Sequence, residues 1–232
     1  VVPITNTTIG NDESAHNRVW YQMEDDGYAY SGGIQPVRTI LNKPQEIPTR
    51  GLLGEVSVPY TDAYLEADVN TDLVYRLYYE TVHWVTKAVD GADGSKWYSL
   101  LDDKNEQYYY VPARHIRLLS NEELAPLSPN VPNENKFVEV RLDDQLVLAY
   151  ENRQIVFATR VSTGVKRLSG NYTTPVGDFI TFHKRPTRHM ATGDIASNGF
   201  DLPGVPWVSY ITKSGISFHG TYWHNDYGRP RS

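Results

Sequence analysis

The stretch GISFHGTYWHNDYGRPRS, residues 215–232, joins a short alternating segment to a histidine and a group of aromatic residues. Alternation of apolar and polar residues predicts strands over 205–211 and 215–218, separated by a three-residue turn. His219 directly follows the second of these strands, so we expect it at a strand end. A single histidine in this place is either a hydrogen-bonded structural residue or a general base, and the residue alone leaves both open.

Two further motifs precede this stretch. Residues 174–179 read TPVGDF and residues 202–207 read LPGVPW. In the first, proline fixes φ and glycine permits a chain reversal, which predicts a tight turn before a strand. Upstream, FVEVRL, QLVLAYE and QIVFATR predict three consecutive strands over 137–160, with a hairpin turn at 143–144.

Together these motifs resemble the L,D-transpeptidase family, the cysteine enzymes that cross-link bacterial cell wall. In that family a strand-end histidine followed by Gly-Thr precedes the tetrad Ser-His-Gly-Cys. His219-Gly220-Thr221 matches the first part, and Ser232 falls where the tetrad begins. The sequence has no cysteine. We therefore expect a chain truncated just before its nucleophile and, as given, inactive.

The resemblance implies acyl transfer from a peptidoglycan stem peptide, through a cysteine thioester, to an acceptor amine. The nucleophile in such chemistry is a thiolate, which needs a nearby base. The resemblance assigns that base to His219, the orientation of its imidazole to the carbonyl of Gly220, and part of the site's frame to Ser232. It implies no cofactor and no metal. The substrate-binding residues that it implies are Met190, Phe200, Trp207, Tyr222 and Trp223.

Residues 183–204, HKRPTRHMATGDIASNGFDLPG, show no periodicity and contain several breakers. The pattern predicts a long loop, and long loops in compact domains often act as lids. By resemblance this loop covers the catalytic groove, with Met190, Phe200 and Trp207 in the groove wall. A surface excursion that tucks these side chains into the core is the alternative.

The first half of the chain has short strands separated by turn signals, which predicts a small barrel over 51–118 that resembles a bacterial SH3-like domain. Residues 18–38 and 97–117 each show a Trp-Tyr strand, an acidic turn and a Tyr-rich strand, so we expect a repeated hairpin; two unrelated hairpins are the alternative. The barrel strands are expected around 55–58, 73–77, 83–89, 97–101 and 108–111.

The predicted fold class is mainly β, with small SH3-like barrels followed by a β-rich L,D-transpeptidase catalytic domain. Proline-containing linkers separate the parts. The predicted divisions are a partial SH3-like module at 1–38, a linker at 39–50, an SH3-like barrel at 51–118, a linker at 119–134 and a C-terminally incomplete catalytic domain at 135–232.

Acidic residues predominate in residues 1–134 and basic residues in 135–232, but no basic run suggests a nucleic-acid partner. No apolar run approaches the length of a membrane span, so any membrane anchor is expected outside this chain. The expected partners are peptidoglycan stem peptides, and the expected location is exported, in the cell envelope or extracellular. The sequence does not predict an oligomeric state.

Two other functions compete with the transpeptidase. A metal hydrolase would use the histidines of the last domain, but no pair has helical metal-ligand spacing and no carboxylate accompanies them. A non-catalytic cell-wall-binding or structural protein built on the same domains is the stronger competitor, because the cysteine is missing. The four histidines concerned are His183, His189, His219 and His224.

Overall fold

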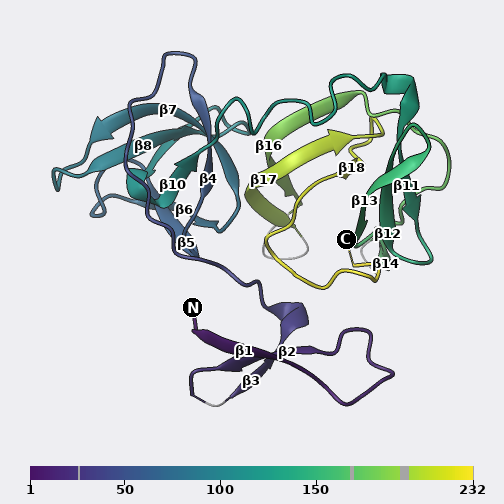
Figure 1. Ribbon diagram of the computed structural model, residues 1–232. Helices are drawn as coiled ribbons and strands as arrows, with labels where there is room; N and C mark the ends of the chain where they lie inside the picture. Colours follow the sequence, from purple (N-terminus) through teal and green to yellow (C-terminus); the bar gives the residue numbers. More distant parts are fainter. Residues whose placement is uncertain (26, 168–169, 194–198, 232) are drawn as a thin grey trace. The chain divides into compact units, whose positions relative to one another are not determined.

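The computed structural model describes residues 1–25, 27–167, 170–193 and 199–231 (Figure 1). Strands contain 44% of the residues and helices 4%, which confirms the prediction of a mainly β chain. Within the described residues, no helix is long and apolar enough to cross a membrane.

The chain folds into two compact units, each assembled from separated parts of the sequence. Residues 135–232, predicted as one domain, contribute to both units, and the domain limits drawn from the sequence remain predictions. Unit 1 contains residues 1–35, 125–178 and 223–232, and unit 2 contains residues 36–124 and 179–222.

Unit 2 contains a seven-stranded antiparallel sheet with the order β10-β4-β7-β8-β9-β5-β6. The five predicted strands are present; the structure adds β10 after the last of them and β5 between the first two. The inward residues of β5, Thr61 and Ala63, are small or polar, so the apolar signal of a buried strand is weak there. The elements are β4 (Leu52–Val56), β5 (Tyr60–Tyr64), β6 (Leu73–Tyr78), β7 (Val82–Asp90), β8 (Lys96–Leu101), β9 (Tyr108–Pro112), the 3-10 helix η2 (Ala113–His115) and β10 (Ile116–Leu118).

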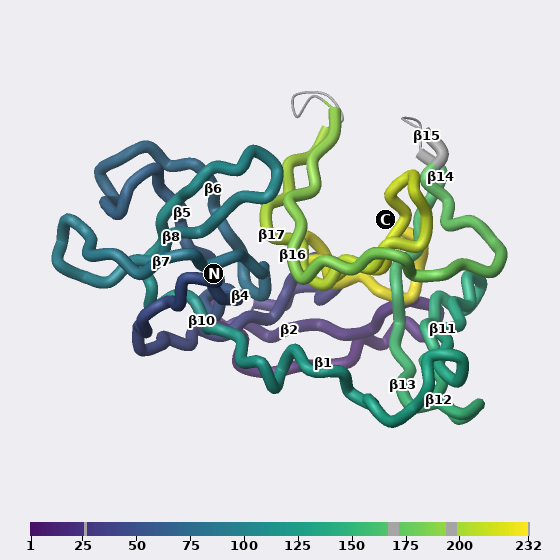
Figure 2. Tube along the Cα trace, turned by 90° about the horizontal axis from the view of Figure 1, so that it is seen from above, coloured from purple at the N-terminus to yellow at the C-terminus, as the bar shows by residue number. Residues whose placement is uncertain are grey.

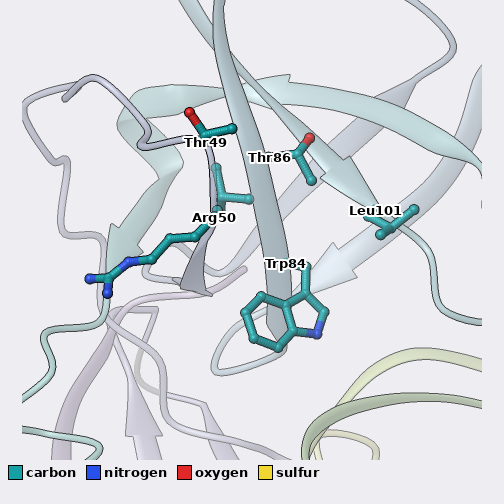
Figure 3. A pocket seen from close by; sticks show the side chains of 7 residues that line it. Thr49, Arg50, Trp84, Thr86 and Leu101 are labelled. Carbon is teal, nitrogen blue, oxygen red and sulfur yellow. The ribbon is translucent and has the colours of Figure 1, made fainter.

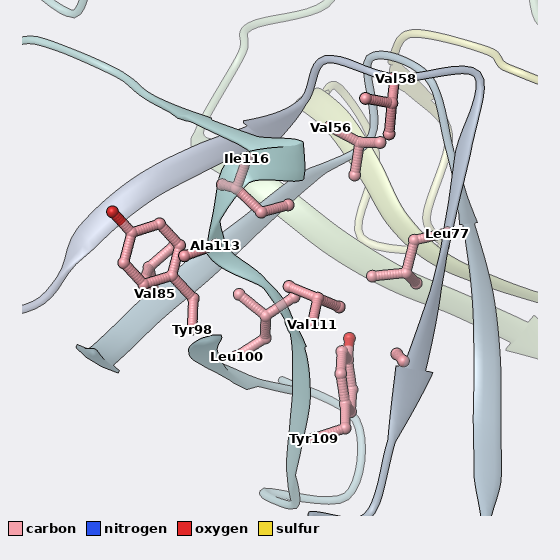
Figure 4. Close-up of a cluster of buried hydrophobic side chains, with 11 residues drawn as sticks. Val56, Val58, Leu77, Val85, Tyr98, Leu100, Tyr109, Val111, Ala113 and Ile116 are labelled. Carbon is pink, nitrogen blue, oxygen red and sulfur yellow. The ribbon is translucent and has the colours of Figure 1, made fainter. Parts of the chain in front are cut away.

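The sheet encloses one hydrophobic core, in which side chains from all its strands meet (Figure 4). Removal of this apolar surface from water is the main force that stabilises the sheet. Tyr98 joins the core to the preceding segment, because its hydroxyl accepts from the Gln45 amide at 2.8 Å. The core residues are Val56, Val58, Ala63, Leu77, Val85, Tyr98, Leu100, Tyr109, Val111, Ala113 and Ile116.

The rest of unit 2 is a three-stranded antiparallel sheet of β16 (His183–Thr192), β17 (Phe200–Tyr210) and β18 (Ser217–Phe218), in the order β16-β17-β18 (Figure 1). Figure 2 also shows β16 and β17 side by side. The predicted strands before His219 are therefore confirmed. The loop predicted over 183–204 is wrong for residues 183–192 and 200–204, which belong to strands, and its residues 194–198 lie outside the described residues.

The buried face of β16 explains the error. Thr187 and His189 are buried, and the Thr187 hydroxyl donates to the Val82 carbonyl of β7. A strand that buries polar residues lacks the apolar alternation by which strands are recognised. Pro186 has no backbone N–H to donate to a neighbouring strand. It is tolerated because β16 is an edge strand of this sheet.

Unit 1 contains three small antiparallel sheets. The predicted strands over 137–160 are confirmed, and the predicted turn at 143–144 lies between the first two of them. The elements are β1 (Ile4–Ile9), β2 (Val19–Met23), β3 (Tyr28–Tyr30), the 3-10 helix η1 (Ser31–Gly33), the 3-10 helix η3 (Asn133–Asn135), β11 (Lys136–Arg141), β12 (Leu146–Glu151), β13 (Gln154–Arg160), β14 (Lys166–Arg167) and β15 (Gly170–Asn171).

The two segments predicted as a repeated hairpin share a local structure. In each, two antiparallel strands are followed directly by a three-residue 3-10 helix, η1 or η2. The residue after each helix is an isoleucine in extended conformation, Ile34 or Ile116. This likeness favours the repeat over two unrelated hairpins.

Candidate functional site

His219 lies immediately after β18, the last strand of the small sheet in unit 2. Strand β18 is held by pairing of Ser209 with Phe218, and the Gly220 amide extends the pairing by donating to the Pro206 carbonyl at 2.9 Å. The backbone on both sides of His219 is thus fixed by β17. A side chain in this position is presented by a rigid element, which suits a group that must be accurately placed.

The ring of His219 is oriented by its own neighbour. Its Nδ1 lies 2.9 Å from the carbonyl oxygen of Gly220. A carbonyl only accepts hydrogen bonds, so Nδ1 carries the hydrogen and Nε2 is the basic nitrogen of the neutral ring. The expected contact between these two residues is therefore present, and it selects the tautomer that a general base requires.

Gly220 has no room for a side chain. A Cβ at this position would lie 2.7 Å from Cγ of Pro206 and 3.4 Å from its Cδ. Any other residue would push the chain away from β17, on which the Gly220 amide bond depends. The requirement for glycine here follows from close backbone approach rather than from a left-handed conformation.

Tyr222 is held by contacts within unit 2. Its ring stacks on Tyr78 with 5.7 Å between centroids, and its hydroxyl donates to the Pro203 carbonyl at 3.2 Å. Burial, with the nearby Tyr78 and Asp201, raises the pKa of Tyr222 well above its usual value. The phenol therefore acts as a neutral donor and not as a base.

Three other predicted residues lie on the β16–β17 hairpin. Met190 pairs with Leu202, and Phe200 pairs with Thr192 at the far end. Trp207 lies next to the Pro206 carbonyl that binds Gly220, is 46% exposed, and has a φ of 58°. A left-handed backbone at a bulky residue is strained, and such strain concentrates at functional sites.

Two predicted residues fall elsewhere. Trp223 belongs to unit 1, where its ring lies 6.3 Å from that of His224. Ser232 lies outside the described residues. The structure therefore places His219 and Gly220 beside the β17 backbone at Pro206 and Trp207, and it binds Tyr222 to β17 at Pro203. Met190 and Phe200 lie at the other end of the hairpin.

A charged cluster that was not predicted from the sequence is buried beside this hairpin. His189 lies between two carboxylates: Nδ1 is 2.7 Å and 2.9 Å from the oxygens of Asp102, and Nε2 is 2.8 Å from Asp201. Ionised carboxylates only accept, so both ring nitrogens donate and the ring is an imidazolium. Burial lowers the pKa of His189, but the bonds and charges of both carboxylates outweigh it and raise the pKa above 6.5.

The turn after β8 supplies further contacts to the same hairpin. Asp103 accepts from Arg185 at 2.9 Å, from Arg188 at 2.8 Å and from the His189 amide at 2.7 Å. Lys104 donates to Asp201 at 2.7 Å. The acidic stretch was predicted from the sequence as a turn. Its second role, binding the polar residues of β16, was signalled in the sequence by the alternation of Arg185, Thr187 and His189.

A second buried histidine behaves in the opposite way. His83 is 2% exposed, and its ring contacts the Thr81 hydroxyl at 3.0 Å. Burial lowers the pKa of His83 to about 3, and the charge of Asp102 offsets this only in part. His83 is therefore neutral and packs tightly, because a Cβ on Gly204 would lie 2.4 Å from its Cε1.

Unit 2 also has an open pocket of about 320 Å³ along β7, between Trp84 and the turn that precedes β4 (Figure 3). None of the predicted site residues lines it. Within the described part of the chain, no group of three histidines or carboxylates is placed to hold a metal ion. The pocket is lined by Thr49, Arg50, Gly51, Trp84, Val85, Thr86 and Leu101.

Comparison with known families gives one match. Residues 135–232 match the model of the YkuD family, described as the L,D-transpeptidase catalytic domain. No curated protein and no solved structure matches the chain. The matched range contains His219, Gly220 and the β16–β17 hairpin. It ends with residues 215–232, which carry the His219-Gly220-Thr221 motif. Residues 135–232 thus carry this chain's similarity to the L,D-transpeptidase catalytic domain, a family that acts on peptidoglycan.

Proposed function

We propose that this chain is part of a peptidoglycan L,D-transpeptidase. The observation that carries the proposal is the bond between Nδ1 of His219 and the Gly220 carbonyl, at 2.9 Å, inside the range that matches the family. It fixes the basic nitrogen of the ring at Nε2, as a base for a thiol requires. The 232 residues contain no cysteine, so we propose that the thiol lies outside them.

The proposed reaction is acyl transfer in two halves. His219 takes the proton of the thiol, a C–S bond forms to the carbonyl carbon of the stem peptide, and the amide C–N bond breaks. The departing D-alanine amine receives the proton from His219. In the second half the acceptor amine forms a C–N bond, the C–S bond breaks, and the proton lost by the amine returns to the sulfur through His219.

The other predicted residues bind the substrate in this proposal. Exposed Trp207, 46% accessible, offers an apolar surface on β17 beside the backbone that binds Gly220. Tyr222 offers a neutral phenol, and Ser232 contributes to the frame of the site. The stem peptide is proposed to contact Met190, Phe200, Trp207, Tyr222 and Trp223.

The proposal includes a setting for the enzyme. Peptidoglycan lies outside the cytoplasm, so we place the protein in the cell envelope or in the extracellular space of a bacterium. We also propose that the seven-stranded sheet over 52–118 is an SH3-like barrel and that residues 1–38 form a related partial module. The likeness of the two hairpins, including η1 and η2, supports this relation.

The test begins with the intact mass of the protein from its natural source, measured with and without iodoacetamide. A mass above 26.4 kDa that gains one alkyl group is the expected result. A mass of 26.4 kDa without gain would overturn the transpeptidase proposal and leave the non-catalytic wall-binding protein.

The second step measures exchange of the terminal D-alanine of a tetrapeptide stem for another D-amino acid. His219→Gln should lower kcat/KM by about 100-fold or more, because general-base catalysis is lost. The control is His183→Gln, which changes a histidine on β16 that stacks on Tyr210. Equal activity of the two variants would remove His219 from its proposed role.

A further inference from the structure

The segment 224–231 in unit 1 follows Trp223 and runs toward Ser232. In the proposed enzyme this is the segment that leads to the nucleophile, so its position matters for the reaction. It has no regular secondary structure. Its position must therefore come from contacts to its neighbours, since an irregular segment has no ladder of its own.

One side of the segment is fixed by the chain that follows β13. The Gly228 amide donates to the Val161 carbonyl at 2.8 Å, and the Arg231 amide donates to the Thr163 carbonyl at 3.0 Å. Between these bonds, the Ser162 hydroxyl donates to the Arg229 carbonyl at 2.9 Å. These partners lie within the range that matches the family.

The other side is contacted by residues 1–35, which contain β1, β2, β3 and η1, lie outside that range and are called the N-terminal hairpin below. Nε2 of His16 donates to the Tyr227 carbonyl at 3.0 Å, and Nδ2 of the Asn225 side chain donates to the Ile34 carbonyl at 3.4 Å. The fit is close: a Cβ on Gly228 would lie 2.9 Å from Cε1 of His16. Gly228 also has a φ of 94°, a conformation that other residues rarely adopt.

A buried carboxylate holds the segment together from within. Asp226 is 1% exposed, and its Oδ2 accepts from Nε of Arg229 at 2.7 Å and from Arg231 at 2.8 Å. Burial raises the pKa of Asp226, but the bonds from both arginines outweigh it and lower the pKa below 3.8. The space beside Oδ1 is limited by η1, because a Cβ on Gly32 would lie 3.3 Å from this atom.

From these contacts we infer that the N-terminal hairpin is a positioning element of the catalytic site. His16 and Ile34 clamp segment 224–231 against the chain after β13, and His16 is a positioning residue because it acts through the Tyr227 carbonyl. The inference rests on the proposed function for its catalytic meaning. The clamp itself is a structural property that can be measured without any activity.

The test compares His16→Ala with the control Thr7→Ala, an exposed change on β1 of the same hairpin. Hydrogen exchange of peptides covering 224–231 should accelerate about 5- to 10-fold in His16→Ala, the effect expected for the loss of one hydrogen bond. Thr7→Ala should leave it unchanged. Asn225→Ala is a second variant, with a smaller acceleration expected because its bond is long. Unchanged exchange in both His16→Ala and Asn225→Ala would overturn the clamp.

Activity separates this inference from the proposed function. In the source protein, His16→Ala should lower kcat several-fold with KM unchanged, because the reacting groups are misplaced while substrate binding persists. Faster exchange with unchanged kcat would overturn the positioning role. Faster exchange in a source protein that lacks transpeptidase activity would refute the proposed function and leave the clamp established.

Discussion

Three histidines differ in their hydrogen-bond partners, and these partners determine how each imidazole ring is protonated. His219 is oriented by a carbonyl, His189 by two carboxylates, and His83 by burial beside a hydroxyl. The first could be predicted, because the Gly-Thr sequence that follows it carries a family resemblance. The other two could not, because they depend on distant residues: Asp102, which contacts His189, is 87 residues away in the sequence, and Tyr109, whose hydroxyl also contacts the His83 ring, is 26 residues away.

The buried charge on His189 makes Asp102 important for stability. Asp102→Asn should lower the free energy of unfolding of unit 2 by about 3 kcal/mol, because it leaves a buried imidazolium with one carboxylate. The control Asp90→Asn removes a partner of Lys96 that is 73% exposed, and it should cost less than about 1 kcal/mol. Exchange of peptides from β7 and β8 reports on the unfolding of this unit. Equal losses would show that the cluster does not hold the hairpin.

At the scale of elements, the strands that the sequence predicted are those rich in apolar residues. The strands of the seven-stranded sheet bury these residues around Val85 and Leu100, whereas the apolar residues of β13 are exposed. Strand β16 was missed because it buries Thr187 and His189. Its polar face is matched by the Val82 carbonyl of β7 and by Asp102 in the turn after β8, which a reading of local sequence cannot pair with it.

Strand β17 passes close to β7 at Gly204, and this contact can be tested by two matched changes. Gly204 and Gly215 both have positive φ, 73° and 105°, but a Cβ meets His83 only at Gly204. Gly215→Ala should cost about 1 kcal/mol of unfolding free energy for the backbone alone. Gly204→Ala should cost about 3 kcal/mol, since overpacking is added. Equal costs by hydrogen exchange would mean that the hairpin adapts freely.

At the scale of the whole molecule, chain order and spatial grouping differ. Residues 179–222 join residues 36–124 in unit 2, while residues 223–232 join the N-terminal hairpin in unit 1. Shifts of composition and proline-rich stretches predict where linkers occur, but they carry no information about which distant segments pair. The charge cluster around Asp103 and the bonds of segment 224–231 are such pairings. They follow only from the folded structure.

The two buried histidines of unit 2 predict how its stability varies with pH. The pKa of His83 is lowered to about 3, so between pH 6.5 and 3 the unfolded chain binds a proton that the folded one does not. Stability should therefore fall on acidification by up to about 1.4 kcal/mol per pH unit. The pKa of His189 is raised, so its contribution is complete below pH 6.5 and is lost as the pH rises through its folded pKa.

These two contributions act on opposite sides of pH 6.5 and can be separated by substitution. Exchange of β7 and β8 peptides at pH 5, 6.5 and 8, corrected for intrinsic rates, gives the free energy of unfolding of unit 2. His83→Gln should flatten the loss between pH 6.5 and 5, and His189→Gln should flatten the loss between pH 6.5 and 8. Both variants also lower the free energy of unfolding at every pH. The test is therefore the change of this free energy with pH, not its absolute value. If stability still falls between pH 6.5 and 8 in His189→Gln, the ring is not the imidazolium that donates a hydrogen bond to each of its two carboxylates.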